Sequence, residues 1–105
     1  MKTKYVTRCA RFHEAEKRFE SWLEFGKQVA EVRKLNELTQ IDLANAMRAN
    51  GEKVTSTEIS RIENGVLVPN DDRRTRALML ALRAGPRQER RLRHLRHAAL
   101  RDLAG

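Results

Sequence analysis

Apolar residues recur at helical spacing along most of the chain, and short polar or glycine-containing stretches separate the helices that this spacing predicts. The first predicted helix covers residues 1–20. Its apolar stripe is formed by Tyr5, Cys9, Phe12 and Phe19. Because an amphipathic helix has to bury such a stripe, we expect it either to cover the core of its own domain or to contact a second copy of the chain. Its polar face is too acidic for a membrane-surface role.

Capping boxes mark the starts of the next three helices. In each box a hydroxyl residue is followed three residues later by a carboxylate, and each side chain can then cap the backbone N–H of the other residue. The pairs are Ser21 with Glu24, Thr39 with Asp42, and Thr55 with Glu58. The sequence therefore predicts a helix from Trp22 to about Asn36 and two shorter helices that begin after Thr39 and Thr55.

The helix that follows Thr55 has two chemically different faces. Ile59 and Ile62 lie on its inner face, where they can meet the apolar residues of the preceding helix, Leu43, Ala44 and Met47. Gly65 ends the helix, because glycine readily adopts the left-handed conformation of a helix C-terminus. The outer face consists of Ser56, Thr57, Ser60, Arg61 and Asn64. Short hydrogen-bonding groups with one guanidinium are suited to reading base edges rather than to catalysis.

The pattern Thr-Gln-x-x-Leu-Ala at residues 39–44, followed by Ile-Ser-x-Ile-Glu-Asn-Gly at residues 59–65, resembles the lambda-repressor-like (Xre/Cro-type) helix-turn-helix family. The resemblance extends over about residues 22–84. It implies a recognition helix at about residues 56–64 that enters the major groove of DNA. The implied DNA-binding residues are Thr39, Gln40, Lys53, Thr55, Ser56, Thr57, Ser60, Arg61 and Asn64.

The resemblance also distributes roles among these residues. Ser56, Thr57 and Arg61 lie nearest the bases, with Ser60 beside them, while Gln40 and Asn64 fix phosphates. The N-termini of the two helices add backbone N–H donors for phosphate at Thr39 and Thr55. A structural ion pair between Arg33 and Glu63 is implied as well.

The connection between the two motif helices departs from the family pattern. Met47 and Val54 enclose the six residues 48–53, where the family usually has a single glycine. We interpret the insertion as an extra half-turn of helix followed by a turn at Asn50-Gly51, which tolerates positive φ.

The last third of the chain predicts two more helices. One begins at Asn70 or Asp71 and ends at Gly85-Pro86, after a segment at residues 66–68 that covers the core or a dimer surface. The other covers residues 86–105. Its apolar stripe is Leu92, Leu95, Ala99 and Leu103, and its basic stripe is Arg87, Arg90, His94, His97 and Arg101. We expect the apolar stripe to help join two copies, so that the domain at residues 21–85 folds without it. The basic stripe either faces water or binds phosphates or an acidic partner.

Composition narrows the range of possible functions. A chain of 105 residues fits one domain, and a net charge of +8 at pH 7 attracts polyanions. Aromatic residues make up 5% of the chain, which favours duplex over single-stranded nucleic acid. One cysteine, Cys9, excludes an internal disulfide and suits a reducing cytoplasm, and no apolar run is long enough to span a membrane.

Catalytic and metal-binding patterns do not stand out. No nucleophile motif or glycine-rich phosphate loop is recognisable, so an enzyme is not expected, and neither is a cofactor. Cys9 with His13, and His94 with His97, have helical ligand spacing, but nothing in the sequence brings the two pairs together, so we expect no metal site.

These observations predict an all-α protein: a compact helix-turn-helix bundle of four to five helices, with an extra amphipathic N-terminal helix and a basic C-terminal helix. The predicted function is a sequence-specific double-stranded DNA-binding transcriptional regulator in the cytoplasm, typically a repressor that binds a palindromic operator as a homodimer. The alternative is a protein-interaction module, such as an antitoxin or adaptor, whose terminal helices hold a protein partner.

Overall fold

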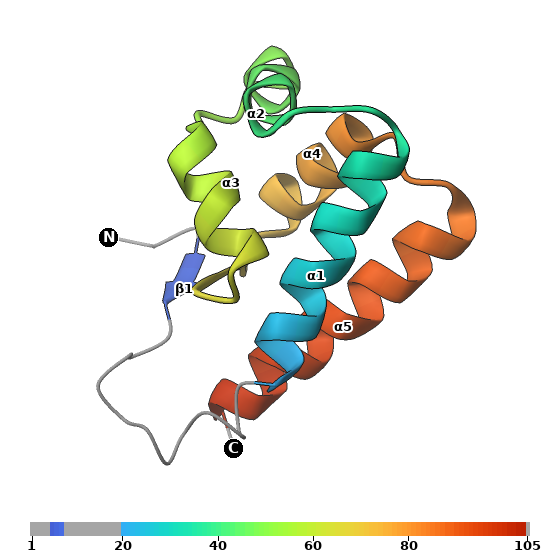
Figure 1. Cartoon of the computed structure of the whole chain (residues 1–105). Helices are drawn as coiled ribbons and strands as arrows, with labels where there is room; N and C mark the ends of the chain where they lie inside the picture. The colour runs from blue at the N-terminus through green and yellow to red at the C-terminus, as the bar shows by residue number, and fades with distance from the viewer. Residues whose placement is uncertain (1–4, 8–19, 105) are drawn as a thin grey trace.

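The computed structural model describes residues 5–7 and 20–104, and these residues form a small helical bundle with one short sheet (Figure 1). The elements in chain order are β1 (Tyr5–Thr7), α1 (Glu20–Leu35), α2 (Gln40–Ala49), α3 (Ser56–Glu63), β2 (Leu67–Pro69), α4 (Asp72–Leu82) and α5 (Pro86–Ala104). The prediction of an all-α bundle is confirmed. Within the described residues, no helix combines the length and the apolar character needed to cross a membrane.

The N-terminal segment corrects one prediction. The helix expected over residues 1–20 is wrong at Tyr5–Thr7, which form strand β1 and pair antiparallel with β2. The register places Tyr5 opposite Pro69, Val6 opposite Val68 and Thr7 opposite Leu67. Tyr, Val and Thr all favour extended backbone, and this local preference outweighs the helical spacing of the apolar residues. The remainder of the predicted helix, including Cys9, Phe12 and Phe19, lies outside the described residues.

Most helix termini follow local chemistry. Thr39, Thr55 and Asp71 are N-caps, since each side chain accepts hydrogen bonds from backbone N–H groups of the following turn. At Thr55 only half of the predicted box forms, because the Thr55 hydroxyl accepts from the Glu58 backbone N–H whereas the Glu58 carboxylate contacts Arg74. The box predicted at Ser21 is not formed, because α1 begins at Glu20 and the Ser21 hydroxyl donates to Asp102 instead. Helix α4 ends before Gly85, since Arg83 adopts the left-handed conformation with φ 57°.

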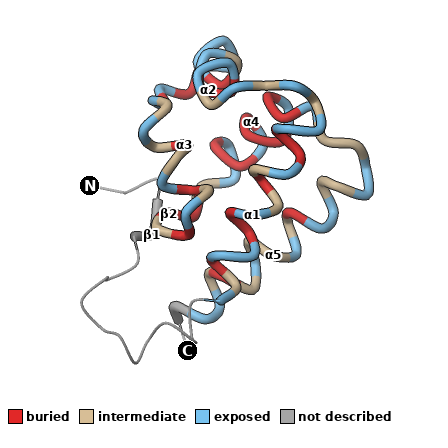
Figure 2. The backbone as a smooth tube through the Cα atoms, in the orientation of Figure 1, coloured by how far each residue is buried: buried red, intermediate tan, exposed pale blue. Residues whose placement is uncertain are grey.

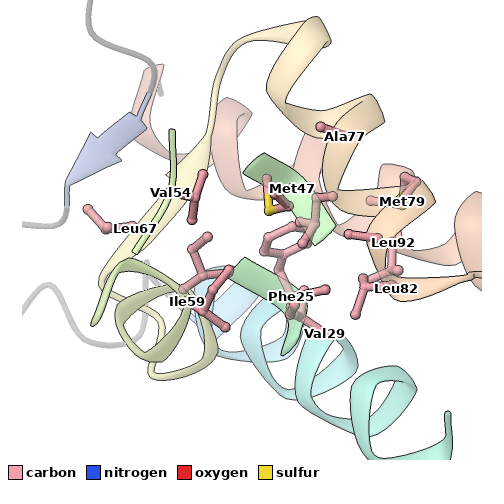
Figure 3. Close-up of a cluster of buried hydrophobic side chains, with 14 of the residues drawn as sticks. Phe25, Val29, Met47, Val54, Ile59, Leu67, Ala77, Met79, Leu82 and Leu92 are labelled. Carbon is pink, nitrogen blue, oxygen red and sulfur yellow. The ribbon is translucent and has the colours of Figure 1, made fainter. Parts of the chain in front are cut away.

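One hydrophobic core lies between the helices, and α1 lies at its centre (Figures 2 and 3). Its largest fully buried apolar side chains are Trp22, Phe25, Leu43, Met47, Ile59, Ile62, Leu78, Leu82 and Leu92. Strand β2 contributes Leu67 and Val68, so the segment after Gly65 covers the core. Every helix of the described part therefore supplies side chains to the same core.

The C-terminal helix packs on its own domain. Leu92 and Ala99 of α5 are completely buried, and the indole Nε1 of Trp22 donates to the Ala99 carbonyl oxygen at 2.9 Å. Leu95 is partly buried against the same core. The stripe is predicted to join two copies, whereas in the structure Leu92 and Ala99 are buried within the same chain. Periodicity identifies the apolar face of a helix but not what covers that face.

Candidate nucleic-acid interface

Helix α3 presents the outer face that its sequence predicts. Ile59 and Ile62 are completely buried, whereas Thr57, Arg61 and Asn64 are exposed. Ser56 and Ser60 are half-buried at the edges of this face. Among the described residues, the Arg61 side chain has no hydrogen-bond or ion-pair partner, while the Asn64 side-chain amide donates to the Ser60 hydroxyl at 3.3 Å. The helix thus offers a free guanidinium among short polar side chains.

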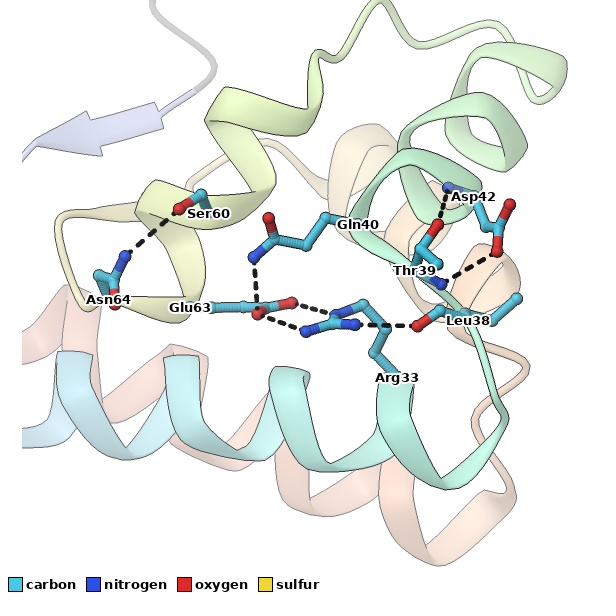
Figure 4. Close-up of polar contacts among 8 residues, drawn as sticks. All are labelled: Arg33, Leu38, Thr39, Gln40, Asp42, Ser60, Glu63 and Asn64. Carbon is cyan, nitrogen blue, oxygen red and sulfur yellow. Dashed lines mark hydrogen bonds and ion pairs between the residues drawn. The ribbon is translucent and has the colours of Figure 1, made fainter.

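The N-terminus of α2 lies beside the C-terminal half of α3 (Figure 4). Thr39 and Asp42 form the predicted capping box, and the pKa of the Asp42 carboxyl is lowered because the Thr39 backbone N–H donates to it. Gln40 follows the cap, and its side-chain amide donates to Glu63 Oε1 at 3.1 Å. Thr39 is exposed and Gln40 is half-buried. The first turn of α2 and the outer face of α3 therefore belong to one surface.

An ion pair between α1 and α3 holds this arrangement. Arg33 donates from Nε to Glu63 Oε2 at 2.6 Å and from Nη2 to Glu63 Oε1 at 3.0 Å. Its third donor, Nη1, reaches the Leu38 carbonyl oxygen at 2.8 Å. The side chains of Arg33 and Glu63 are 11% and 8% exposed, and the pKa of Arg33 is raised because Glu63 accepts its hydrogen bonds. The pair suggested by the sequence thus joins α1, the α1–α2 loop, α2 and α3.

A close approach of backbones sets the distance between α1 and α3. A Cβ at Gly26 would lie 2.6 Å from the Glu63 carbonyl oxygen and closer still to that of Ile62. These atoms belong to the last turn of α3, so they cannot move without moving the helix. Glycine at position 26 therefore allows α3 to lie directly on α1.

We expect Gly26→Ala to destabilise the fold by about 1–3 kcal/mol, as overpacking of a tight contact does. Alanine is a better helix former than glycine by up to about 1 kcal/mol, so a net loss would show that the clash outweighs helix propensity. Thermal denaturation followed by circular dichroism measures the change. Gly51→Ala provides a comparison, because nothing lies within 4 Å of its added Cβ and any cost there comes from its φ of 86°. An unchanged or increased melting temperature for Gly26→Ala would contradict the close approach.

Arg74 anchors the connection between α2 and α3, and the sequence does not predict this role. Arg74 of α4 donates from Nε to Glu52 Oε1 at 3.0 Å and from Nη2 to the Lys53 carbonyl oxygen at 3.1 Å. It also contacts Glu58 on α3 at 3.4 Å. Glu52 and Arg74 are 2% and 5% exposed. A carboxylate inside the inserted segment was the available signal, but the sequence does not show which cation it meets.

Backbone contacts at both ends of residues 48–55 hold the connection between α2 and α3 in addition to Arg74. Helix α2 ends at Ala49, Asn50 is its C-cap, and Gly51 takes the predicted positive φ. The Arg48 side chain closes the connection by donating to the Val54 carbonyl oxygen at 2.9 Å. Lys53 and Thr55 stay exposed at the N-terminus of α3. The predicted site residues therefore fall into two groups, one at each end of α3.

In the described part of the chain, no group of three or more His, Cys, Asp or Glu residues is arranged to hold a metal ion, and Cys9 and His13 lie outside that part. In comparisons with known proteins, no family model, no curated protein and no solved structure matches the chain.

Proposed function

We propose that this protein is a sequence-specific double-stranded DNA-binding regulator, in which the outer face of α3 reads base edges in the major groove. The observation that carries the proposal is that face itself. It combines the exposed Thr57, Arg61 and Asn64 with an inner face held rigidly by the Arg33–Glu63 pair. Side chains that discriminate between bases need fixed positions, and a helix locked on its core provides them.

Electrostatics and flanking donors support the same proposal. A net charge of +8 strengthens association with a polyanion. The capped N-termini of α2 and α3 provide backbone N–H groups and positive dipole ends near Thr39 and Thr55, where phosphates would lie on either side of the groove. Repression of transcription and a cytoplasmic location are parts of this proposal.

The proposed regulator binds a palindromic operator as a homodimer, since one small domain offers limited discrimination and two recognition helices lie about one DNA turn apart, roughly 34 Å. Leu92 and Ala99 of the α5 stripe are buried within the domain, so we expect the contact between copies to use another surface. The same burial removes the apolar face of α5 from the alternative of an antitoxin or adaptor. The other surface on which that alternative relies, the amphipathic N-terminal segment, lies largely outside the described residues.

Selection of bound duplexes from a random pool tests the proposal. A palindromic consensus would support both base readout and two-fold assembly. A consensus without symmetry would support base readout and contradict binding as a symmetric homodimer. Enrichment of no sequence, with binding retained, would contradict sequence specificity.

We expect Arg61→Ala to weaken binding to the selected sequence by about 1–3 kcal/mol and to relax the preference at one position in each half-site, as loss of a bidentate guanine contact does. Fluorescence anisotropy against single-base variants of the site measures both effects. Arg73→Ala is the control, because Arg73 is an exposed arginine on α4. Equal weakening on every sequence would make Arg61 a phosphate contact instead.

A further inference from the structure

The outer face of α5 is a second basic surface. Its five residues step by three and four positions, so they form one stripe about 21 Å long at 1.5 Å per residue, and all are exposed: Arg87, Arg90, His94, His97 and Arg101. Among the described residues, none of these five side chains makes a hydrogen bond or ion pair, whereas both carboxylates of α5 do. Glu89 contacts Arg93, and Asp102 accepts from Ser21. The stripe therefore carries uncompensated positive charge.

Helices α5 and α3 lie on different sides of α1 (Figure 1). Gly26 and Arg33 of α1 contact α3, whereas Ser21 and Gln28 contact α5. Positions 21 and 26 differ by five residues, which corresponds to about 140° around a helix. The stripe lies on the side of α5 opposite Leu92 and Ala99, so it points away from α1 altogether.

The surface between the outer face of α3 and the α5 stripe is mixed in charge. Its exposed charged residues on α1 are Glu24, Lys27, Glu31 and Lys34, which alternate in sign. A duplex that lies on the outer face of α3 would have to cross this neutral strip to reach α5. One straight duplex therefore cannot use both basic surfaces of the same chain.

The chemistry of the stripe favours a nucleic-acid backbone over an acidic protein. Protein–protein interfaces usually have an apolar centre surrounded by polar residues. The stripe contains arginine and histidine alone, whereas Leu92, Leu95, Ala99 and Leu100 of α5 pack in or against the core. A row of guanidinium groups matches a continuous line of phosphates, which arginine binds through paired hydrogen bonds.

We infer that the α5 stripe binds the phosphate backbone of a second duplex segment, so that the protein bridges two duplexes, one on α3 and one on α5. The inference rests on the proposed function in one respect, namely that α3 holds the first duplex. Binding at α5 is independent of sequence, because phosphate contacts position a protein without reading bases.

A capture experiment with the full chain tests this inference. One selected duplex, roughly three helical turns long, is fixed to beads, and a second fluorescent duplex of unrelated sequence is added in solution with or without protein. The test variant carries Arg87→Gln, Arg90→Gln and Arg101→Gln. The control carries Arg73→Gln, Arg76→Gln and Arg83→Gln, which remove the same charge from exposed positions outside α3 and α5. Anisotropy with the selected duplex alone reports binding at α3.

We expect the wild type and the control to capture the fluorescent duplex. The amount captured by the α5 variant should fall at least about tenfold, while the affinity of that variant for the selected duplex should change less than about threefold. Capture by the α5 variant equal to the control would overturn the inference. So would loss of selected-duplex binding in that variant, because α5 would then belong to the first surface. A changed sedimentation coefficient in the α5 variant would also overturn it, since the stripe would then serve assembly.

Two further outcomes separate this inference from the proposed function. If capture depends on α5 but the protein shows no preference among sequences, base readout by α3 is contradicted and binding of a duplex at α5 is supported. The affinity of polyglutamate for the wild type and for the α5 variant provides the second outcome. If polyglutamate binds the wild type more tightly than the unrelated duplex does, and binds the α5 variant weakly, the occupant is an acidic protein and the inference is overturned.

Discussion

A chain that ends at Ala84 is expected to lose its cooperative fold. Without α5, Trp22 loses its cover, and its indole N–H loses the Ala99 carbonyl acceptor. Removing a buried leucine such as Leu92 costs about 2–5 kcal/mol. The uncovered Trp22 ring also loses about 25 cal/mol for each Å² of apolar surface that becomes exposed to water. Together these losses approach the whole stability of a small domain, which is typically about 5–15 kcal/mol.

Circular dichroism and thermal denaturation of the truncated chain measure this effect. A chain that ends at Leu100 is the matched control, because it keeps Leu92 and Ala99 and loses residues 101–105, among them Asp102, whose hydrogen bond with Ser21 is exposed. We expect the control to melt cooperatively and the chain ending at Ala84 to show no cooperative transition. A sharp transition of the shorter chain near the full-length melting temperature would mean that α5 is an appendage rather than part of the core.

Local chemistry made much of the candidate site predictable. The caps at Thr39 and Thr55 depend on side chains within three residues of the backbone groups they satisfy, so the sequence alone locates both helix starts. Gly65 takes a φ of 75°, as expected of a helix stop. Alternation of buried and exposed positions along α3 also follows directly from its 3.6-residue period.

Contacts between distant segments were not predictable in the same way. Strand β1 pairs with β2 across about sixty residues, and nothing in either sequence specifies its partner. The strand-forming residues Tyr5, Val6 and Thr7 were a usable signal, but the helical spacing of apolar residues suggested a different structure. Arginine is usually exposed, so the sequence does not predict that Arg74 is buried beside Glu52.

Replacement of Glu63 by alanine is expected to destabilise the protein by about 3–5 kcal/mol, because it leaves the largely buried guanidinium of Arg33 without its carboxylate partner. The same change removes the acceptor for Gln40, so it loosens α2 as well as α1 from α3. Chemical denaturation measures the free energy of unfolding. The comparison variant is Glu58→Ala, since Glu58 is 29% exposed and 3.4 Å from its arginine. That pair should contribute no more than about 1 kcal/mol.

A double variant separates the unpaired charge from the loss of packing. In Arg33→Met with Glu63→Leu, both charges are removed together, and a buried ion pair replaced in this way by apolar side chains is often neutral or stabilising. We therefore expect the double variant to recover most of the stability that Glu63→Ala loses. If the double variant is as unstable as Glu63→Ala, the loss comes from packing or from Gln40 rather than from the stranded guanidinium. If Glu63→Ala itself melts within about a degree of the parent, Arg33 is solvated after the substitution, and α3 is held on α1 by the apolar contacts and the close approach at Gly26.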